Sequence, residues 1–381
     1  MIYFDNGATS FPKPASVINT MVRCMTEYCG NPGRSGHFMS MKTGEKVYEA
    51  RQETASFFNI DKGENLIFTK NTTEALNLGI KGLLAEGDHV ITTSMEHNSV
   101  LRPIKAMEKS GVDHSIVWAD PQGRISVEDI EAQINEKTKL IVVTAASNVC
   151  GTRMPLQRIG ELAEKRGILF MVDGAQGAGA MPLNVKKYKI DLLAFPGHKG
   201  LLGPLGTGGL YISDRAKIIP LMEGGTGTDS KSIYHPFDRP EGFEAGTINA
   251  PGIIGLGEAV KTVKEIGLKN IEYHERQLTR RLEDKLRNMD FVVVYGPEAE
   301  EKVGIILFNI EGISSEDVTA ILSSRYGICV RGGYHCAGLA HKTIGTWDRG
   351  AVRVSFGPFN TLKEINALAD AVWRIGKGHR L

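Results

Sequence analysis

The sequence carries almost no excess of charge of either sign. Among its 381 residues, 45 lysines and arginines are balanced by 44 aspartates and glutamates, which leaves a formal net charge of +1. No uninterrupted apolar run approaches the ~20 residues that a membrane-spanning helix needs, and the first residues lack the basic and apolar segments of a signal peptide. We therefore expect no nucleic acid and no membrane as a partner, and a cytoplasmic location.

Cysteine is also scarce. The chain has five, which are Cys24, Cys29, Cys150, Cys329 and Cys336. Their odd number and scattered spacing do not describe a disulfide framework, and no CxxC pair or zinc-finger spacing occurs. His335, Cys336 and His341 lack a fourth ligand, so no metal site is expected.

Residues from about 65 to 213 alternate short apolar runs with amphipathic stretches. The predicted strands are residues 65–69, 89–92, 114–117, 139–144, 169–173, 192–194 and 208–212. The predicted helices are residues 73–85, 100–110, 127–132 and 155–166. Several of these strands are apolar throughout, which is typical of a mostly parallel sheet with helices on both faces. The pattern predicts an α/β fold.

The second part of the chain predicts a smaller α/β lobe. Its predicted helices are residues 252–266, 270–289, 315–325 and 362–375, and its predicted strands are 291–295, 303–309 and 328–331. The length alone already favours two domains or lobes.

Polar residues and glycines gather where the predicted strands end, at residues 69–74, 94–97, 147–148, 173–176 and 196–199. Open α/β sheets bind their ligands at this edge. Thr72 and Thr73 lie at the start of a predicted helix, where backbone N–H groups and hydroxyls can bind a phosphate. The alternative is a capped helix without a ligand, because threonine is also a favoured N-cap.

Asp173, Lys199 and Cys336 are the candidates for chemistry. Asp173 ends an apolar strand and can either cap a helix or hold a positive charge. Lys199 lies among glycines and is either solvated or desolvated enough for Schiff-base chemistry. Cys336 lies near Arg331 and His335 in a glycine-containing loop, a setting that favours a reactive thiolate over an inert buried thiol. An anion site, a strand-end acid and a lysine together meet the needs of pyridoxal phosphate.

An ordered series of motifs over nearly the whole chain carries a family resemblance. The motifs are residues 3–9, 31–34, 71–77, 95–99, 172–176, 197–199, 243–247 and 331–337. With them the chain resembles class V aminotransferase-fold proteins, and among these the Suf-type (group II) cysteine desulfurases, which are similar to selenocysteine lyases. The resemblance implies pyridoxal phosphate fold type I. A large domain (14–251) with a mostly parallel seven-stranded sheet would bind the cofactor, and a small domain (1–13 and 252–381) would carry the cysteine loop.

The resemblance also implies a role for each matching residue. Lys199 would bind the cofactor covalently, His97 would stack on its ring, Asp173 would keep the pyridine nitrogen protonated and Gln176 would contact the phenolic oxygen. The phosphate would be held by Thr72, Thr73, His198 and, from the second subunit of a homodimer, Thr247. Asn148 would lie at the cofactor and, with Arg353 and Arg331, would orient the substrate carboxylate.

The implied reaction converts L-cysteine to L-alanine. Lys199 would remove the Cα proton, His97 would shuttle the thiol proton, and Cys336 would receive the sulfur as a persulfide for transfer to an acceptor protein. Selenocysteine lyase, another class V aminotransferase or β-lyase, and a non-catalytic cofactor-binding or sulfur-relay scaffold are the alternatives. Two positions depart from the family pattern: Pro196 replaces a phosphate-binding serine, and Tyr334 replaces a second histidine before His335.

Overall fold

The computed structural model describes residues 1–33, 35–228 and 230–380. In this part of the chain, seven strands form one large sheet with the order β2-β8-β7-β6-β5-β3-β4. β8 runs antiparallel to the other six strands, which are parallel to one another, so the predicted α/β fold with a mostly parallel seven-stranded sheet is confirmed. The strands are β2 (Leu66–Thr69), β3 (His89–Thr93), β4 (Asp113–Val117), β5 (Thr138–Thr144), β6 (Leu169–Asp173), β7 (Leu192–Pro196) and β8 (Gly208–Ile212).

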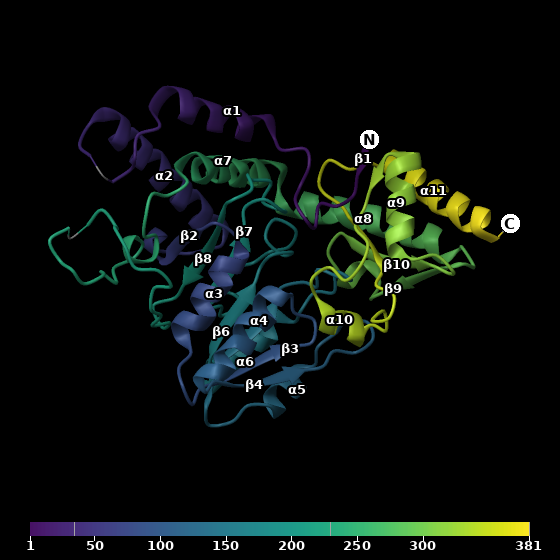
Figure 1. Cartoon of the computed structure of the whole chain (residues 1–381), viewed down its shortest axis with the longest axis horizontal. Helices are drawn as coiled ribbons and strands as arrows, with labels where there is room; N and C mark the ends of the chain where they lie inside the picture. The colour runs from purple at the N-terminus through teal and green to yellow at the C-terminus, as the bar shows by residue number, and fades with distance from the viewer. Residues whose placement is uncertain (34, 229, 381) are drawn as a thin grey trace.

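Helices cover both faces of this sheet (Figure 1). One face packs against α3 (Thr72–Leu83) and α4 (Asn98–Met107), and it buries Leu140 and Val142 of β5. The opposite face buries Ile141 and Val143 and packs against α5 (Val127–Ala132), α6 (Leu156–Arg166), α2 (Phe38–Phe57) and α7 (Ala250–Ile266). Alternate side chains of one strand thus enter two cores, which explains why the strand is apolar throughout.

The N-terminal helices α1 (Ala15–Arg23) and α2 lie outside the segments for which the hydrophobic pattern makes a prediction. Both pack against α7. Gly257 of α7 allows a close approach, because a Cβ atom there would lie 2.6 Å from the Cβ of Ala50 in α2.

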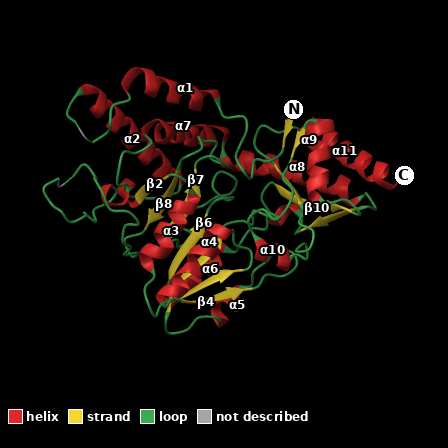
Figure 2. Ribbon diagram, viewed as in Figure 1, coloured by secondary structure: helices red, strands yellow, loops and turns green. Residues whose placement is uncertain are grey.

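A smaller lobe contains both ends of the described chain, and Figure 2 shows its strands as a separate group. Its antiparallel sheet has the order β12-β10-β9 and consists of β9 (Val292–Tyr295), β10 (Ile305–Ile310) and β12 (Val352–Ser355). Helices α8 (Leu268–Arg287), α9 (Ser315–Tyr326) and α11 (Leu362–Arg380) belong to this lobe. The first strand, β1 (Ile2–Tyr3), pairs in parallel with β11 (Ile328–Cys329), so the N-terminus is built into the C-terminal lobe.

The short helix α10 (Gly338–Thr343) follows the Cys336 loop and docks on the large lobe. Ala340 packs in the core that contains Ile141 and Val143 of β5, and the Thr343 hydroxyl donates to the Ser94 hydroxyl at 2.9 Å. The domain limits 14–251 and 252–381 stay a prediction, since α7 lies across this boundary and packs with the large lobe. Among the described residues, none of the helices has the length and apolar character to cross a membrane.

Candidate active site

A cavity of about 200 Å³ lies where β3, β5, β6 and β7 end. It unites the polar clusters that the sequence places at strand ends. Its lining includes Thr72, Thr73, His97, Asn148, Asp173, Gln176, His198 and Lys199. All the residues predicted to touch the cofactor from within one subunit therefore share one cavity.

The N-terminus of α3 forms one wall of this cavity. Asn71 caps the helix, because its side-chain oxygen accepts a hydrogen bond from the Glu74 amide at 2.9 Å. The hydroxyl of Thr72 is buried and has no partner among the described residues, while the Thr73 hydroxyl lies 2.8 Å from that of Ser99. Free amides and hydroxyls at a helix N-terminus favour an anion.

His198 and Lys199 follow the end of β7. The His198 carbonyl accepts hydrogen bonds from the Thr9 hydroxyl at 3.0 Å and from the Lys13 ammonium at 2.9 Å, which fixes this turn. Its ring nitrogen Nδ1 is buried and has no partner among the described residues. Burial, together with Lys199 and Lys13, lowers the pKa of His198 to about 4, so the ring is neutral at pH 7.

Lys199 and Asp173 supply the two charged groups of the cavity. Burial, reinforced by Arg353, lowers the pKa of Lys199 to about 8, whereas Asp173 opposes this shift. Asp173 accepts a hydrogen bond from the Ala175 amide at 2.9 Å, and burial raises its pKa. A lysine amine that is partly neutral at pH 7 is the nucleophile that an aldehyde requires.

His97 caps α4 and faces the cavity. Its Nδ1 accepts a hydrogen bond from the Ser99 amide at 3.0 Å, so a neutral ring carries its proton on Nε2. Burial, with Lys199 and Arg331 as further causes, lowers the pKa of His97 to about 4. His97 is therefore a neutral ring with a proton on Nε2.

These residues fit pyridoxal phosphate. The unpartnered Thr72 hydroxyl and His198 Nδ1 stand beside the α3 N-terminus, where a phosphate group would complete their hydrogen bonds. Lys199 can bind the aldehyde, and Asp173 can pair with the protonated pyridine nitrogen. Gln176 donates to the Gly7 carbonyl at 2.9 Å, which fixes its side chain at the cavity wall.

Arg353 lies on β12 and is almost completely buried. Its Nη2 donates to Asp5 at 2.8 Å and its Nη1 to the Asn148 carbonyl at 2.9 Å, while Nε is buried without a partner among the described residues. The side chain is held by two hydrogen bonds, and its Nε–H remains available as a donor. A guanidinium in this state is suited to a carboxylate.

Cys336 lines a second cavity, of about 450 Å³, which shares Thr73, His97 and Ser99 with the first. Its thiol is exposed, and the Arg331 guanidinium donates to the sulfur at 3.7 Å. All five cysteines are unpaired, and Cys29 is exposed as well, so it is not a buried structural thiol.

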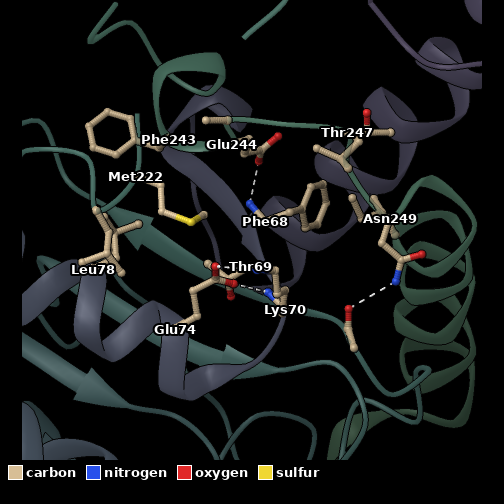
Figure 3. Close-up of a pocket in the computed structure, with 15 residues that line it drawn as sticks. Phe68, Thr69, Lys70, Glu74, Leu78, Met222, Phe243, Glu244, Thr247 and Asn249 are labelled. Atoms are coloured by element: carbon tan, nitrogen blue, oxygen red, sulfur yellow. Dashed lines mark hydrogen bonds and ion pairs between the residues drawn. The ribbon is translucent and has the colours of Figure 1, made fainter. Parts of the chain in front are cut away.

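Thr247 does not lie in either of these cavities. It lines a separate one, of about 170 Å³, together with Phe68 and Glu244 (Figure 3). Glu244 accepts a hydrogen bond from the Phe68 amide and forms a buried bidentate ion pair with Arg51, at 2.7 and 2.8 Å. This pair fixes the loop that carries Thr247.

Three further positions belong to the family pattern. Pro196 ends β7 opposite Gly208 of β8, and the Tyr334 ring is partly exposed and contacts His341 and Trp347. Arg34 lies outside the described residues. In the part of the chain that the structure describes, no group of three or more histidines, cysteines and acids could hold a metal.

Sequence reasoning missed several polar partners. Asp5 orients Arg353, and Ser99 bridges His97 and Thr73. Glu96 is buried, accepts hydrogen bonds from the Thr93 hydroxyl and the Thr144 amide, and has its pKa raised to about 8 by burial. Asp5 lies in the motif of residues 3–9, and Glu96 and Ser99 lie in the motif of residues 95–99. This position within a motif is the only feature of the sequence that points to them as site residues.

Comparisons with known proteins agree with this site. The family profile described as "Aminotransferase class-V" matches residues 2–368. A probable cysteine desulfurase from Methanothermobacter thermautotrophicus is 38% identical over 380 residues, which cover 98% of this chain and 94% of that protein. One from Pyrococcus abyssi is 37% identical over 390 residues, covering 100% of this chain and 95% of that protein.

Solved structures are similar over the whole chain. The apo structure of a cysteine desulfurase from Thermococcus onnurineus NA1 has a TM-score of 0.94 and 37% identity, and the match covers 99% of this chain and 95% of that one. A cysteine desulfurase from Escherichia coli in its S-sulfonic acid form has a TM-score of 0.89 and 28% identity, with 98% and 94% covered. The chain therefore belongs to the class V aminotransferase family of pyridoxal phosphate-dependent enzymes of fold type I.

Proposed function

We propose that this protein is a cysteine desulfurase, which converts L-cysteine to L-alanine and carries the sulfur as a persulfide on Cys336. The observation that carries the proposal is the exposed Cys336 thiol, which lines a cavity that meets the Lys199 cavity at His97. An aminotransferase or a simple β-lyase has no need of a thiol at this position. The names of the relatives in three organisms support the same activity. Assignment to the Suf type stays a prediction.

Substrate binding would rest on Arg353, Asn148 and Arg331. The Arg353 Nε–H has no partner among the described residues, and the position of the side chain is fixed by Asp5 and by the Asn148 carbonyl. An α-carboxylate would complete the hydrogen bonds of this guanidinium. Arg331 lies on the Cys336 side, where a second cation helps to attract the carboxylate of the substrate.

The first chemical step needs a proton acceptor at the substrate Cα. When bound, pyridoxal phosphate supplies an electron sink that stabilises the carbanion formed there. Lys199 would take the Cα proton, because its lowered pKa leaves a useful fraction of the amine neutral at pH 7. Asp173 would hold the proton on the ring nitrogen of the cofactor.

The sulfur transfer step would use Cys336 and His97. The Cys336 thiolate attacks the sulfur of the substrate, an S–S bond forms and the Cβ–S bond breaks. The electron pair of the broken bond stays on the carbon fragment, which takes up protons and leaves as alanine. The Nε2 proton of His97 is available for donation at the boundary of the two cavities.

A homodimer would complete the phosphate site. Thr247 lies in a separate cavity, which supports the proposal that it reaches the phosphate bound to a second copy of the chain. The sulfur acceptor would be a protein thiol, and selenocysteine would be a second substrate of the same site.

The decisive experiment incubates the purified protein with L-cysteine and measures alanine together with the mass of the Cys336 peptide. A gain of about 32 Da, one sulfur atom, on this peptide is expected. Cys336→Ala should abolish persulfide formation and keep the absorbance of the bound cofactor, and Cys29→Ala, which removes the other exposed thiol, should change neither. Lys199→Ala should lose the absorbance band of the lysine-bound cofactor.

Other outcomes identify the alternatives. Pyruvate or another α-keto acid in place of alanine would show a β-lyase or aminotransferase. A much faster reaction with selenocysteine would show a selenocysteine lyase, and cofactor binding without turnover of either amino acid would show a scaffold. Unchanged sulfur release by Cys336→Ala would overturn the role of this cysteine.

A further inference from the structure

The backbone of the Cys336 loop is held in an uncommon conformation. His335 and Cys336 have φ angles of +52° and +58°, so two consecutive residues with a Cβ atom lie in the left-handed region. Steric repulsion between the side chain and the backbone disfavours this region for such residues. The surrounding contacts must therefore hold both residues in place.

The backbone carbonyls of the two residues are held from the large lobe. The Asn148 side-chain amide donates to the His335 carbonyl at 2.7 Å, and the Asn98 backbone amide donates to the Cys336 carbonyl at 2.8 Å. Asn98 is the first residue of α4, directly after His97. These two hydrogen bonds fix where the loop lies against the large lobe.

The His335 side chain holds the loop from the opposite side. It is buried, with 2% of its surface exposed, and its Nε2 lies 3.2 Å from the Arg331 carbonyl. A carbonyl only accepts, so Nε2 carries the proton and Nδ1 of the neutral ring must accept. Nδ1 lies 3.1 Å from Nε2 of His341, which is therefore the donor.

The chain of hydrogen bonds continues to Thr346. His341 carries its proton on Nε2, so its Nδ1 accepts from the Thr346 hydroxyl at 2.7 Å. His341 and Thr346 have no exposed surface, and the two imidazole rings stack at 5.3 Å with 13° between their planes. Burial lowers the pKa of His341 to about 4 and that of His335 well below its ordinary value, so both rings stay neutral.

The order of donors along this chain leaves no alternative tautomer. If His335 carried its proton on Nδ1, its bare Nε2 would face the Arg331 carbonyl, which can only accept. The Arg331 carbonyl therefore sets the tautomer of His335, and His335 sets that of His341. Through these hydrogen bonds Thr346 and His341 hold the His335 ring against the Arg331 carbonyl. The Arg331 guanidinium in turn contacts the Cys336 sulfur.

We propose that His341 and Thr346 are positioning residues for sulfur transfer, which act through His335 to hold the Cys336 thiol beside Arg331. The proposal rests on the function proposed above for Cys336. Since His341 and Thr346 are buried, the hydrogen bonds of their side chains reach the Cys336 loop through His335.

The test compares His341→Phe with His341→Gln. Phenylalanine keeps a buried ring but cannot donate to His335, whereas the amide of glutamine can replace the Nε2 donor. In the cofactor-loaded protein, His341→Phe should slow alkylation of Cys336 by iodoacetamide at pH 7.5 about fivefold, because the thiol loses its contact with Arg331. It should slow single-turnover persulfide formation about tenfold and leave the KM for cysteine within about twofold, and His341→Gln should recover most of both rates.

His89→Phe is the matched control. His89 is also a buried histidine between two hydroxyls, those of Thr138 and Ser115, but it lies on β3. The His89→Phe substitution should leave the alkylation rate of Cys336 unchanged. Thr346→Val, which keeps the shape of the side chain, should give a smaller loss of about threefold in both rates, and Thr346→Ser should restore them.

The results separate this proposal from the proposed function. The alkylation rates require no turnover of cysteine, so they report on the position of Cys336 even when the parent protein forms no persulfide. If the rate of Cys336 alkylation in both His341→Phe and Thr346→Val stays within twofold of the rate in the parent protein, the positioning role is overturned. If His341→Phe does not fold, an unchanged alkylation rate in Thr346→Val is enough to overturn the positioning role. Absence of a persulfide in the parent would overturn the proposed function.

Discussion

At the scale of single residues, burial decides which groups of the site are charged. It is the largest cause of the lowered pKa values of Lys199, His97 and His198, and of the raised pKa of Asp173. Neighbouring cations act in the same direction on the first three. The cavity therefore holds two neutral imidazoles and a lysine whose charge changes near physiological pH.

The lysine makes cofactor loading dependent on pH. Only the neutral amine attacks an aldehyde, and the pKa of Lys199 is lowered to about 8. The rate at which pyridoxal phosphate binds to cofactor-free protein should rise as the pH passes through about 8. Below the pKa the neutral fraction shrinks, so the rate should fall about tenfold between pH 7 and pH 6. Stopped-flow absorbance measures this rate.

The Arg353→Gln variant tests the direction in which the pH midpoint of this loading rate moves. Arg353 is the second cause that lowers the pKa of Lys199, so its removal should move the midpoint to higher pH. A loading rate that is constant from pH 6 to pH 10 would contradict the assignment of Lys199 as the attacking amine.

At the scale of elements, helix N-termini build the two cavities. α3 and α4 begin at the cavity edge, and each is capped by a side chain, Asn71 and His97. The cap of α3 fixes the turn that presents Thr72 and Thr73. Loosening this turn should therefore cost stability and cofactor affinity together.

Asn71→Ala and Ser314→Ala separate these two effects. Both side chains are exposed N-caps, on α3 and α9, and each accepts a backbone hydrogen bond, at 2.9 and 3.0 Å. Each substitution should lower the free energy of unfolding by about 1 kcal/mol. Only Asn71→Ala should weaken pyridoxal phosphate binding, by about fivefold, because Ser314 lies outside the cavity. Urea unfolding and cofactor titration measure the two quantities, and equal affinities would refute the role of the α3 turn.

The elements that could be predicted from the sequence are those with one simple pattern. β6 and β8 occur at the predicted residues because a continuous apolar or glycine-bounded run defines them. α2 gives no such signal, since it buries polar residues such as Thr43, Arg51 and Thr54 along with apolar ones. α4 begins at Asn98 rather than at the predicted residue 100, because the His97 side chain caps it.

The candidate site could be predicted as far as strand ends define it. Eight predicted residues meet in the cavity because the carboxyl ends of parallel strands share one edge. A partner from a distant segment could not be predicted, since Asp5 reaches Arg353 only because it pairs with Ser355 at the end of β12 in the smaller lobe. Spacing in the sequence carries no record of such contacts.

At the scale of the whole molecule, one predicted phosphate ligand is separated from the others. Thr247 belongs to the cavity shown in Figure 3, whereas Thr72, Thr73 and His198 line the Lys199 cavity. The buried ion pair of Arg51 and Glu244 anchors the loop three residues before Thr247. If each phosphate site combines Thr247 of one copy with Thr73 of the other, a copy with a substituted Thr247 and a copy with a substituted Thr73 must together form one intact site.

Co-expression of Thr247→Val with Thr73→Ala tests this sharing. Each variant alone should bind pyridoxal phosphate about tenfold or more weakly than the unsubstituted protein. In a mixed dimer, one site combines the intact Thr73 of one copy with the intact Thr247 of the other. Random pairing should therefore restore native affinity to about a quarter of all sites, as measured by cofactor titration. No recovery in mixed dimers, verified by differently tagged copies, would rule out a shared site.

The pairing of β1 with β11 also bears on how the protein is made. Residues 2 and 3 pair with residues 328 and 329, so this contact joins segments that are far apart in the order of synthesis. The large sheet can form while the chain is still growing, because its strands end at Ile212. Asp5 meets Arg353 only after the last strand has been translated. An unfinished polypeptide thus lacks the Arg353 guanidinium that we propose as the substrate carboxylate site, and ribosome-bound chains should be catalytically silent.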